Sequence, residues 1–282
     1  MSRAPDNDFL AAMASSSRER VAQARAVIPE RDLQVRARDL PPPPRLQLSQ
    51  DGFDLIAEVK LRSPAAGLLK GRAEDLAARV IAYADAGAAA ISVLTEPTRF
   101  DGTLSHLTAA SDALAGRIPL MRKDFLVDPY QVYEARAAGA GGILMILRML
   151  TPAAARSLLD AAAALGLFVL LEAFDAADLA SAASLVERYA ARLVLLVGVN
   201  CRDLTTLEVV PGRLEQLAAQ LPHTVARVAE SGVTTLEDAA RVAAVGYNVA
   251  LVGSALMQSD DPRALTDALL SAGRAAARVR CG

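Results

Sequence analysis

The 282-residue chain contains few histidines and cysteines and no tryptophan. His106 and His223 are its only histidines, and neither lies in a metal-ligand spacing, which argues against a His-based zinc site or a Ser–His–Asp triad. Cys201 and Cys281 also form no metal spacing, and we expect them to stay unpaired in a reducing compartment. The sequence therefore predicts no metal site and no disulfide framework.

The chain also lacks long apolar runs and an excess of charge of one sign. Its longest apolar segments, residues 141–147 and 165–171, fall well short of the roughly 20 residues that span a bilayer. No basic segment followed by an apolar core opens the chain, so we expect no secretory signal. Thirty basic and 32 acidic residues nearly balance, which predicts no attraction to nucleic acid or anionic lipid. We expect a cytoplasmic protein with neither nucleic-acid nor membrane partners.

From Asp54 onward, a short β-type apolar run, a polar loop and an alanine-rich helix recur along the chain. The run starts are separated by roughly 22 to 36 residues, the length that a strand and its crossover helix require. No GxGxxG segment follows the first run, which argues against an open doubly wound sheet. We therefore predict an α/β fold, a closed (β/α)₈ TIM barrel, with strands within residues 54–60, 89–95, 119–124, 141–147, 168–174, 194–200, 226–232 and 248–253.

Capping residues predict where the outer helices begin. Thr234, with Glu237 three residues later, has the spacing of a capping box. Gly139 and Gly166 are placed to end two helices. Three further helices are predicted to start with a capping residue followed by proline, at Asp128–Pro129, Thr151–Pro152 and Asp261–Pro262.

The first 48 residues differ from the repeating part. They carry an amphipathic, Arg-rich stretch and then four prolines, Pro41 to Pro44, which cannot continue a helix. The charges of this segment are mixed, which favours a helix packed on the domain over an arm that binds a partner. We predict an N-terminal helical extension over residues 1–48 and a barrel catalytic domain over residues 49–282.

Polar residues concentrate at the carboxyl ends of the predicted strands, where barrel enzymes carry their active sites. Side-chain alternation places Glu58 and Lys60 on one side of their strand. Purely structural ion pairs remain an alternative for single residues, but burying six such groups is energetically costly, so the set as a whole indicates a catalytic site. The strand-end residues are Glu58, Lys60, Thr95, Lys123, Asp124, Glu172, Asn200, Arg202, Glu230, Ser231, Gly253 and Ser254.

Two glycine-containing loops predict a phosphate site. Residues 230–232 read ESG and residues 252–256 read VGSAL, and they follow the seventh and eighth predicted strands. Barrels frequently bind phosphate at this place, through backbone amides and a helix N-terminus.

Taken in order, these strand-end segments resemble those of the indole-3-glycerol phosphate synthase family. RKDF with DPYQ shortly after it, and the later N-x-R-D-L, are the most specific of them. The helix and prolines before the barrel also resemble that family. The resemblance covers nearly the whole chain, through IAEVKLRSPAAG, SVLTEPTRFDG, PLMRKDFLVDPYQVYEARAAGA, LLEAFD, GVNCRDLTTLEV, ESGV and LVGSALM.

The resemblance implies a reaction and a role for each residue. The family converts 1-(2-carboxyphenylamino)-1-deoxyribulose 5-phosphate into indole-3-glycerol phosphate in tryptophan biosynthesis, without metal or organic cofactor. Lys123 would be the general acid that protonates the ribulose carbonyl. Proton transfer would also involve Glu172, Lys60 and Glu58, in an order that stays open, and the remaining catalytic residues would be Asn200 and Glu230.

The same resemblance implies the binding residues. Arg202 would bind the anthranilate carboxylate through its planar donor fork, and Phe100 and Phe125 would form the apolar walls. The substrate-binding set is Ser63, Phe100, Phe125, Arg202, Leu204 and Ser231. The phosphate-binding set is Lys60, Gly232, Gly253 and Ser254.

Some residues depart from the family pattern, and some questions stay open. Ala65 and Ala66 stand where the family usually has a hydroxyl and a charge, with an effect that the sequence does not define. Cys201 replaces an asparagine, and by alternation we expect a buried, inert thiol.

The alternative functions are a phosphoribosylanthranilate isomerase-like barrel and a non-catalytic phosphate-binding barrel. A ring-substituted substrate also stays open, as does the choice between monomer and homodimer.

Overall fold

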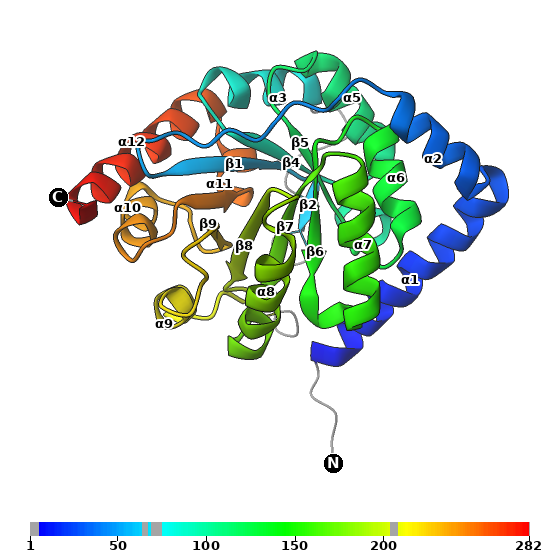
Figure 1. Ribbon diagram of the computed structural model, residues 1–282. Coiled ribbons are helices and arrows are strands. Elements are labelled where there is room, and N and C mark those ends of the chain that lie inside the picture. Colours follow the sequence, from blue (N-terminus) through cyan, green and yellow to red (C-terminus); the bar gives the residue numbers. More distant parts are fainter. Residues whose placement is uncertain (1–5, 64–66, 69–74, 204–207, 282) are drawn as a thin grey trace.

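A computed structural model describes residues 6–63, 67–68, 75–203 and 208–281 of the chain. Parallel strands alternate with helices and close on themselves in the neighbour order β1-β10-β9-β8-β7-β6-β5-β4. The first strand, β1, pairs with β10 on one side and with β4 on the other, and the helices surround the barrel (Figure 1). The predicted TIM barrel is confirmed.

Each barrel strand lies inside a run predicted from the sequence, with ends that differ by at most two residues. The strands are β1 (Asp54–Val59), β4 (Ala90–Leu94), β5 (Leu120–Lys123), β6 (Gly142–Ile146), β7 (Phe168–Ala173), β8 (Leu195–Asn200), β9 (Ala226–Glu230) and β10 (Val249–Val252). The sequence did not predict the short antiparallel hairpin after β1, formed by β2 (Arg62–Ser63) and β3 (Gly67–Leu68).

Helices fill the connections between strands and precede the first strand. They are α1 (Asp6–Val27), α2 (Glu30–Asp39), α3 (Leu76–Asp85), α4 (Pro97–Phe100), α5 (Leu104–Leu114), α6 (Pro129–Ala137), the 3₁₀ turn η1 (Leu147–Met149), α7 (Pro152–Ala164), α8 (Ala176–Tyr189), α9 (Arg213–Ala218), α10 (Leu236–Ala244), α11 (Ser254–Gln258) and α12 (Pro262–Cys281). Within the described ranges, none of them is long and apolar enough to cross a membrane.

Side-chain caps explain why several helices begin where they do. The Asp128 carboxylate accepts from the backbone of α6, the Thr151 hydroxyl accepts from that of α7, and both predicted caps are confirmed. The predicted capping box of α10 is wrong by one residue, because Thr235 and Asp238 form it. Residues 234–238 read TTLED, so a capping box could start at either threonine. The Asp238 carboxylate accepts from the backbone N–H groups of Thr234 and Thr235, which places the N-cap at Thr235.

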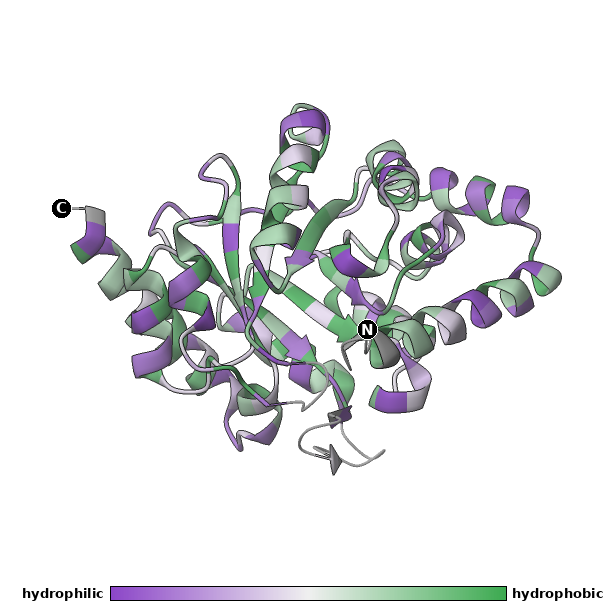
Figure 2. Cartoon of the chain, turned by 90° about the horizontal axis from the view of Figure 1, so that it is seen from below, coloured by the Kyte–Doolittle hydropathy of each residue, from purple (hydrophilic) through white to green (hydrophobic). Residues whose placement is uncertain are grey.

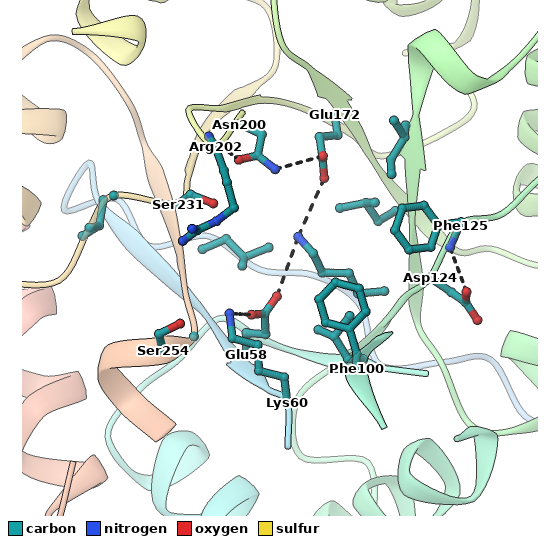
Figure 3. A pocket seen from close by; sticks show the side chains of 18 of the residues that line it. Glu58, Lys60, Phe100, Asp124, Phe125, Glu172, Asn200, Arg202, Ser231 and Ser254 are labelled. Atoms are coloured by element: carbon teal, nitrogen blue, oxygen red, sulfur yellow. Dashed lines mark hydrogen bonds and ion pairs between the residues drawn. The ribbon is translucent and has the colours of Figure 1, made fainter. Parts of the chain in front are cut away.

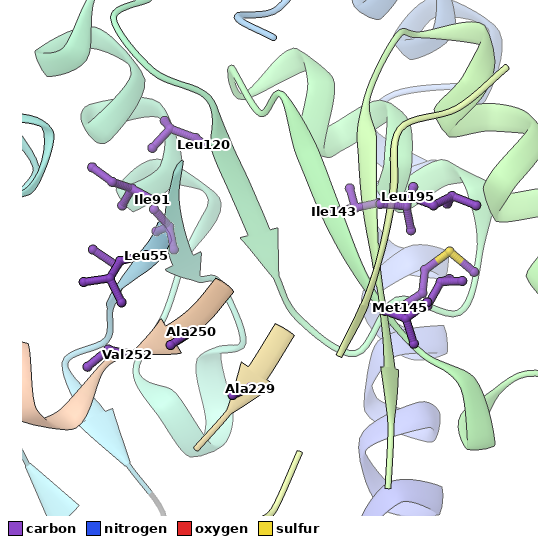
Figure 4. Close-up of a cluster of buried hydrophobic side chains, with 14 of the residues drawn as sticks. Leu55, Ile91, Leu120, Ile143, Met145, Leu195, Ala229, Ala250 and Val252 are labelled. Atoms are coloured by element: carbon purple, nitrogen blue, oxygen red, sulfur yellow. The ribbon is translucent and has the colours of Figure 1, made fainter. Parts of the chain in front are cut away.

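Alternation along the strands separates two apolar cores. Outward side chains pack against the helices, and Figure 4 shows Leu55, Ile91, Leu120, Ile143 and Leu195 among them. Inward side chains fill the barrel itself, among them Ile56, Met121, Leu144, Phe168, Leu170, Leu196, Val228 and Val249. Hydrophobic residues follow the strands and hydrophilic stretches mark the outer helices in Figure 2. Both faces of each strand are therefore buried, as in other parallel sheets with helices outside.

The N-terminal helices lie outside the barrel, where α2 packs against α6 (Figure 1). Helix α1 is tied to the end of β5, because Arg20 donates two hydrogen bonds of 2.9 and 2.8 Å to Asp124. The Ser17 hydroxyl donates to the backbone carbonyl of Phe125. The domain boundary between residues 48 and 49 stays a prediction.

Candidate active site

A pocket opens at the carboxyl ends of the barrel strands, and most of the predicted site residues line it (Figure 3). They come from strand ends, from the segments that follow the strands and from the short helices α4 and α11, so residues far apart in the sequence meet at one mouth. The predicted residues in the lining are Glu58, Lys60, Phe100, Lys123, Phe125, Glu172, Asn200, Arg202, Ser231, Gly232, Gly253 and Ser254.

Lys123, the last residue of β5, lies among three carboxylates. Its Nζ is 3.1 Å from Glu230 Oε2 and 3.7 Å from both Glu58 Oε2 and Glu172 Oε2. Burial alone would lower the pKa of Lys123, but the charges of Glu230, Glu172 and Glu58 outweigh it and raise the pKa above its ordinary value. The side chain is therefore an ammonium at neutral pH, with protons to donate into the pocket.

A second cation, Lys60, lies beside Glu58, one of these three carboxylates. Lys60 Nζ is 2.7 Å from Glu58 Oε1, and alternation along β1 and its extension places both side chains on the inner side of the barrel (Figure 3). Burial by itself raises the pKa of Glu58, but Lys60, Lys123 and Arg202 lower it further than burial raises it. Glu58 is therefore ionised and bridges the two lysines.

Glu230 lies deeper than the rest and is only 1% exposed. Burial, with the charge of Glu172, raises the pKa of Glu230 to about 8 against the opposing effect of Lys123. Its Oε1 atom is buried and has no hydrogen-bond partner among the described residues. The pocket thus places two carboxyl groups whose pKa values are displaced in opposite directions, Glu58 downward and Glu230 upward, beside one ammonium, which is how acid and base roles are separated.

Asn200 orients its neighbours at the end of β8. Its Nδ2 donates to Glu172 Oε1 at 3.1 Å, and its Oδ1 accepts from the backbone N–H of Arg202 at 2.9 Å. The Arg202 side chain points into the pocket from the loop after β8 (Figure 3). The Asn200 side chain therefore holds both the Glu172 carboxylate and the backbone of Arg202 in place.

Aromatic rings form one wall of the pocket. The ring centroids of Phe100 and Phe125 are 6.3 Å apart, and those of Phe9 and Phe125 are 5.9 Å apart in an edge-to-face arrangement. Sequence reasoning missed Phe9, because it belongs to α1 and no strand-end pattern points to it. It also missed Leu144 and Ile146, although alternation along β6 would have identified them as inward-facing.

The predicted phosphate residues meet on the other side of the pocket. Ser231 and Gly232 have positive φ values of 66° and 69°, a conformation that costs a non-glycine residue roughly 1 kcal/mol or more. Gly253 directly precedes α11, and a Cβ at this position would lie 2.9 Å from Lys60 Nζ. Lys60 therefore lies against the loop that carries Gly253 and Ser254.

Three predicted residues are not part of the described lining: Glu230, which is buried 3.1 Å from Lys123 Nζ, Ser63 and Leu204. Ser63 pairs with Gly67 in the β2–β3 hairpin, and Leu204 lies outside the described residues. The departure at Ala65 and Ala66 also lies outside the described residues.

The expectation of a buried thiol at Cys201 is confirmed, and Asp124 has structural partners. The Asp124 carboxylate points away from the pocket centre, where it accepts hydrogen bonds from Arg20, Arg122 and Thr95 (Figure 3). Cys201 is buried, and burial raises the pKa of its thiol to about 11.

The family model for indole-3-glycerol phosphate synthase matches residues 10–269 of the chain. The sequence is 41% identical over 255 residues to the indole-3-glycerol phosphate synthase of Mycobacterium ulcerans, covering 90% of each chain. The chain belongs to the indole-3-glycerol phosphate synthase family. The enzyme of this name from Saccharopolyspora erythraea is 40% identical over 260 residues, which cover 91% of this chain and 92% of the relative.

Membership of the indole-3-glycerol phosphate synthase family makes the chain an enzyme, a lyase of tryptophan biosynthesis with a phosphorylated small-molecule substrate.

More distant solved structures show the fold alone. Thiamine phosphate pyrophosphorylase from Pyrococcus furiosus aligns with a TM-score of 0.56 at 16% identity, covering 80% of this chain and 98% of its own. Yersinia pestis dihydropteroate synthase aligns with a TM-score of 0.57 at 18% identity, covering 83% and 96%. Within the part of the chain that the structure describes, no cluster of three or more His, Cys, Asp or Glu residues could hold a metal ion.

Proposed function

We propose that this pocket converts 1-(2-carboxyphenylamino)-1-deoxyribulose 5-phosphate into indole-3-glycerol phosphate, with Lys123 acting on the ribulose carbonyl. The observation that carries the proposal is the Lys123 ammonium held among Glu58, Glu172 and Glu230 beside an aromatic wall. An ammonium fixed in this way can protonate the carbonyl oxygen of a substrate whose ring lies against Phe100 and Phe125.

In the first step, the ring carbon that bears the carboxylate forms a bond to the ribulose carbonyl carbon. The carbonyl oxygen takes a proton from Lys123 and becomes a hydroxyl. Loss of carbon dioxide from the same ring carbon then returns the electron pair of the broken bond to the ring, which becomes aromatic again. The carboxylates around Lys123 support this step because they keep the lysine protonated before the substrate arrives.

In the last step the new hydroxyl leaves as water, which requires a proton at the oxygen and the loss of a proton from the neighbouring carbon. The pocket offers groups for both on opposite sides of Lys123: Lys60 with Glu58 on one side, and Glu172 held by Asn200 on the other. We propose that these two pairs supply the acid and the base.

We further propose that the two anionic ends of the substrate are bound at different places. Arg202 binds the anthranilate carboxylate through its planar donor fork. Lys60, the backbone amides at Gly232 and Gly253, and Ser254 bind the phosphate. Two alternative functions remain, a phosphoribosylanthranilate isomerase-like barrel and a non-catalytic barrel. Either would share the phosphate loops, but neither would explain why Lys123 lies among three carboxylates. A cytoplasmic location, supported by the biosynthetic family, and a monomer or homodimer are also proposed.

An assay of indole formation tests the proposal. The protein, freed of metal with a chelator and given the carboxyphenylamino-deoxyribulose phosphate, should produce indole fluorescence. Lys123→Ala should lose at least about 1,000-fold in kcat while keeping its thermal unfolding transition, because the carbonyl then has no proton donor. Arg192→Ala, which removes an exposed ion pair with Asp160, is the control and should keep full activity. Near-normal kcat in Lys123→Ala would show that another group acts on the carbonyl.

A further inference from the structure

Three glycines occupy inward-facing positions of the barrel strands or their ends, and each leaves room for a large side chain from the adjacent strand. A Cβ on Gly142 would overlap the ring of Phe168, one on Gly198 would overlap Glu230 Oε1, and one on Gly253 would overlap Glu58 Oε1. Two of the three spaces therefore hold carboxyl groups of the proposed site. The third, at the opposite end of the barrel, holds a ring of the apolar core.

Gly198 is a glycine for reasons of space. It lies within β8, paired with Glu172 of β7 and Val228 of β9, and its φ is not in the left-handed region. Alanine could adopt this backbone, but its methyl group would meet Glu230 Oε1 first and then Glu230 Cδ and Leu170 Cδ1, both 3.1 Å from an added Cβ. The absent side chain at position 198 therefore makes a niche for one carboxyl group.

The niche also fixes how that carboxyl group faces the pocket. Glu230 Oε1 lies against Gly198, without a hydrogen-bond partner among the described residues, while Oε2 lies 3.1 Å from Lys123 Nζ. A carboxyl group pushed out of the niche would move toward the mouth of the pocket, and its contact with the ammonium would change.

We propose that Gly198 is a positioning residue for the reaction: its missing side chain holds the Glu230 carboxyl folded against β8, so that Oε2 faces the Lys123 ammonium. This inference rests on the proposed function for the role of Glu230 and Lys123. Within it, Gly198 touches neither the substrate nor the reacting atoms and acts only through Glu230.

The niche has an electrostatic consequence that can be measured. Burial is the largest cause that raises the pKa of Glu230 to about 8. A carboxyl group displaced toward the mouth regains solvent, so its pKa should fall. The variant Gly198→Ala should therefore lower the pKa of Glu230, and the limb of the kcat profile that Glu230 controls should move to lower pH by about one unit.

The experiment compares Gly198→Ala with Gly142→Ala, two strand glycines whose added methyl groups meet different neighbours. Carboxyl carbon NMR titration reads the pKa of Glu230 directly, and steady-state kinetics give kcat, KM and the pH profile. We expect Gly198→Ala to lose about 100-fold in kcat, with KM changed less than threefold, since the phosphate loops and the aromatic wall are untouched. Gly142→Ala should lower the unfolding temperature and leave the Glu230 titration where it was.

A double-variant cycle separates positioning from general damage. If Gly198 acts through Glu230, then adding Gly198→Ala to Glu230→Ala should change kcat less than twofold. A further 100-fold loss in that background would overturn the inference. Should Gly198→Ala not fold, Gly198→Ala with Glu230→Asp is the substitute, because the shorter acid withdraws from the added methyl group. Failure of this pair to fold would also overturn the inference.

The outcomes also separate this inference from the proposed function. A lower kcat with an unmoved Glu230 titration would overturn the positioning role of Gly198 and leave the proposed chemistry intact. A moved titration with unchanged kcat would show that Glu230 takes no part in turnover, which would overturn both its proposed catalytic role and the role of Gly198.

Discussion

Lys123, the last residue of β5, and Asp124, which follows it, show how one strand end can serve both the proposed chemistry and the structure. Lys123 lines the pocket. The Asp124 carboxylate points away from the pocket centre, where Arg122, Arg20 and Thr95 hold it. Burial alone would raise the pKa of Asp124, but these partners outweigh it and hold the pKa well below its usual range. Alternation thus places an ionised structural acid directly after the ammonium that we propose as the proton donor, on the opposite side of the strand.

Asp124→Asn should destabilise the protein by about 3 kcal/mol at pH 7, because buried Arg122 and partly buried Arg20 both lose this ion-pair partner. A group with a depressed folded pKa contributes stability above its unfolded pKa, near 4, and loses it as the pH falls further. The difference between the two proteins in urea midpoint should therefore be full at pH 7 and smaller at pH 3. Asp112→Asn, an exposed acid of α5, is the control. A difference that stays constant from pH 7 to pH 3 would contradict the assigned cause.

Glu230 should show the opposite dependence on pH. Its folded pKa of about 8 lies above the unfolded value near 4, so the folded state binds the proton more tightly and loses stability as the pH rises between these values. Glu230→Gln keeps a neutral side chain at every pH. It should therefore gain about 2 kcal/mol relative to the parent protein between pH 6 and pH 9, even though its activity falls. Chemical unfolding at both pH values measures this, and parallel stability curves would refute it.

At the scale of whole elements, α1 connects the outside of the barrel to the pocket. Near the start of the helix, Phe9 contacts Phe125 edge-to-face and lines the pocket. Toward its end, Arg25 bonds Asp128, the N-cap of α6. The helix therefore contacts the segment between β5 and α6 at two places, and one end of it forms part of the aromatic wall of the pocket.

Removal of one ring from α1 should weaken substrate binding without affecting the chemistry. Phe9→Ala should raise KM about tenfold and leave kcat within about twofold, because the wall loses an aromatic contact while Lys123 keeps its carboxylates. Val27→Ala, at the exposed end of the same helix, is the matched control and should behave as the parent protein. A fall in kcat with unchanged KM in Phe9→Ala would assign this helix a role in the chemical step.

The contrast between α1 and the strands explains what the sequence could predict. Strand-end residues such as Lys123 and Glu172 were predicted because alternation and the barrel rule place them without knowledge of packing. Phe9 was not, because its approach to Phe125 depends on how a helix from another part of the chain docks. The hairpin β2–β3 has strands of two residues, which leave no period to detect. The space at Gly198 was missed as well, because a missing side chain has meaning only beside the Glu230 carboxyl.

At the scale of the whole molecule, the barrel closes where its first strand meets its last strand and the last helix. The first strand, β1, pairs with the last, β10, and α12 packs against α10 and α3. Arg274 of α12 donates to the backbone carbonyl of Phe53 at 3.1 Å and to the buried Asp54 carboxylate at 3.0 Å. Asp54 also accepts from the backbone N–H of Ser49 at 2.7 Å. The last helix therefore fixes the first strand at the end of the barrel opposite the pocket.

Arg274→Ala should therefore weaken closure of the barrel and leave the chemistry alone. Among the described residues, the buried Asp54 carboxylate would keep only the Ser49 N–H as a partner. This should cost about 2–3 kcal/mol and lower the unfolding temperature by about 5 °C or more. Well below that temperature, kcat and KM should stay within twofold, because the substitution lies at the opposite end of the strands from Lys123. Arg278→Ala, an exposed arginine of the same helix, controls for the loss of a positive charge. Calorimetry and steady-state assays on both variants measure the two effects. A loss of kcat in Arg274→Ala without a change in unfolding temperature would mean that the two ends of the barrel are coupled through the strands, not held independently.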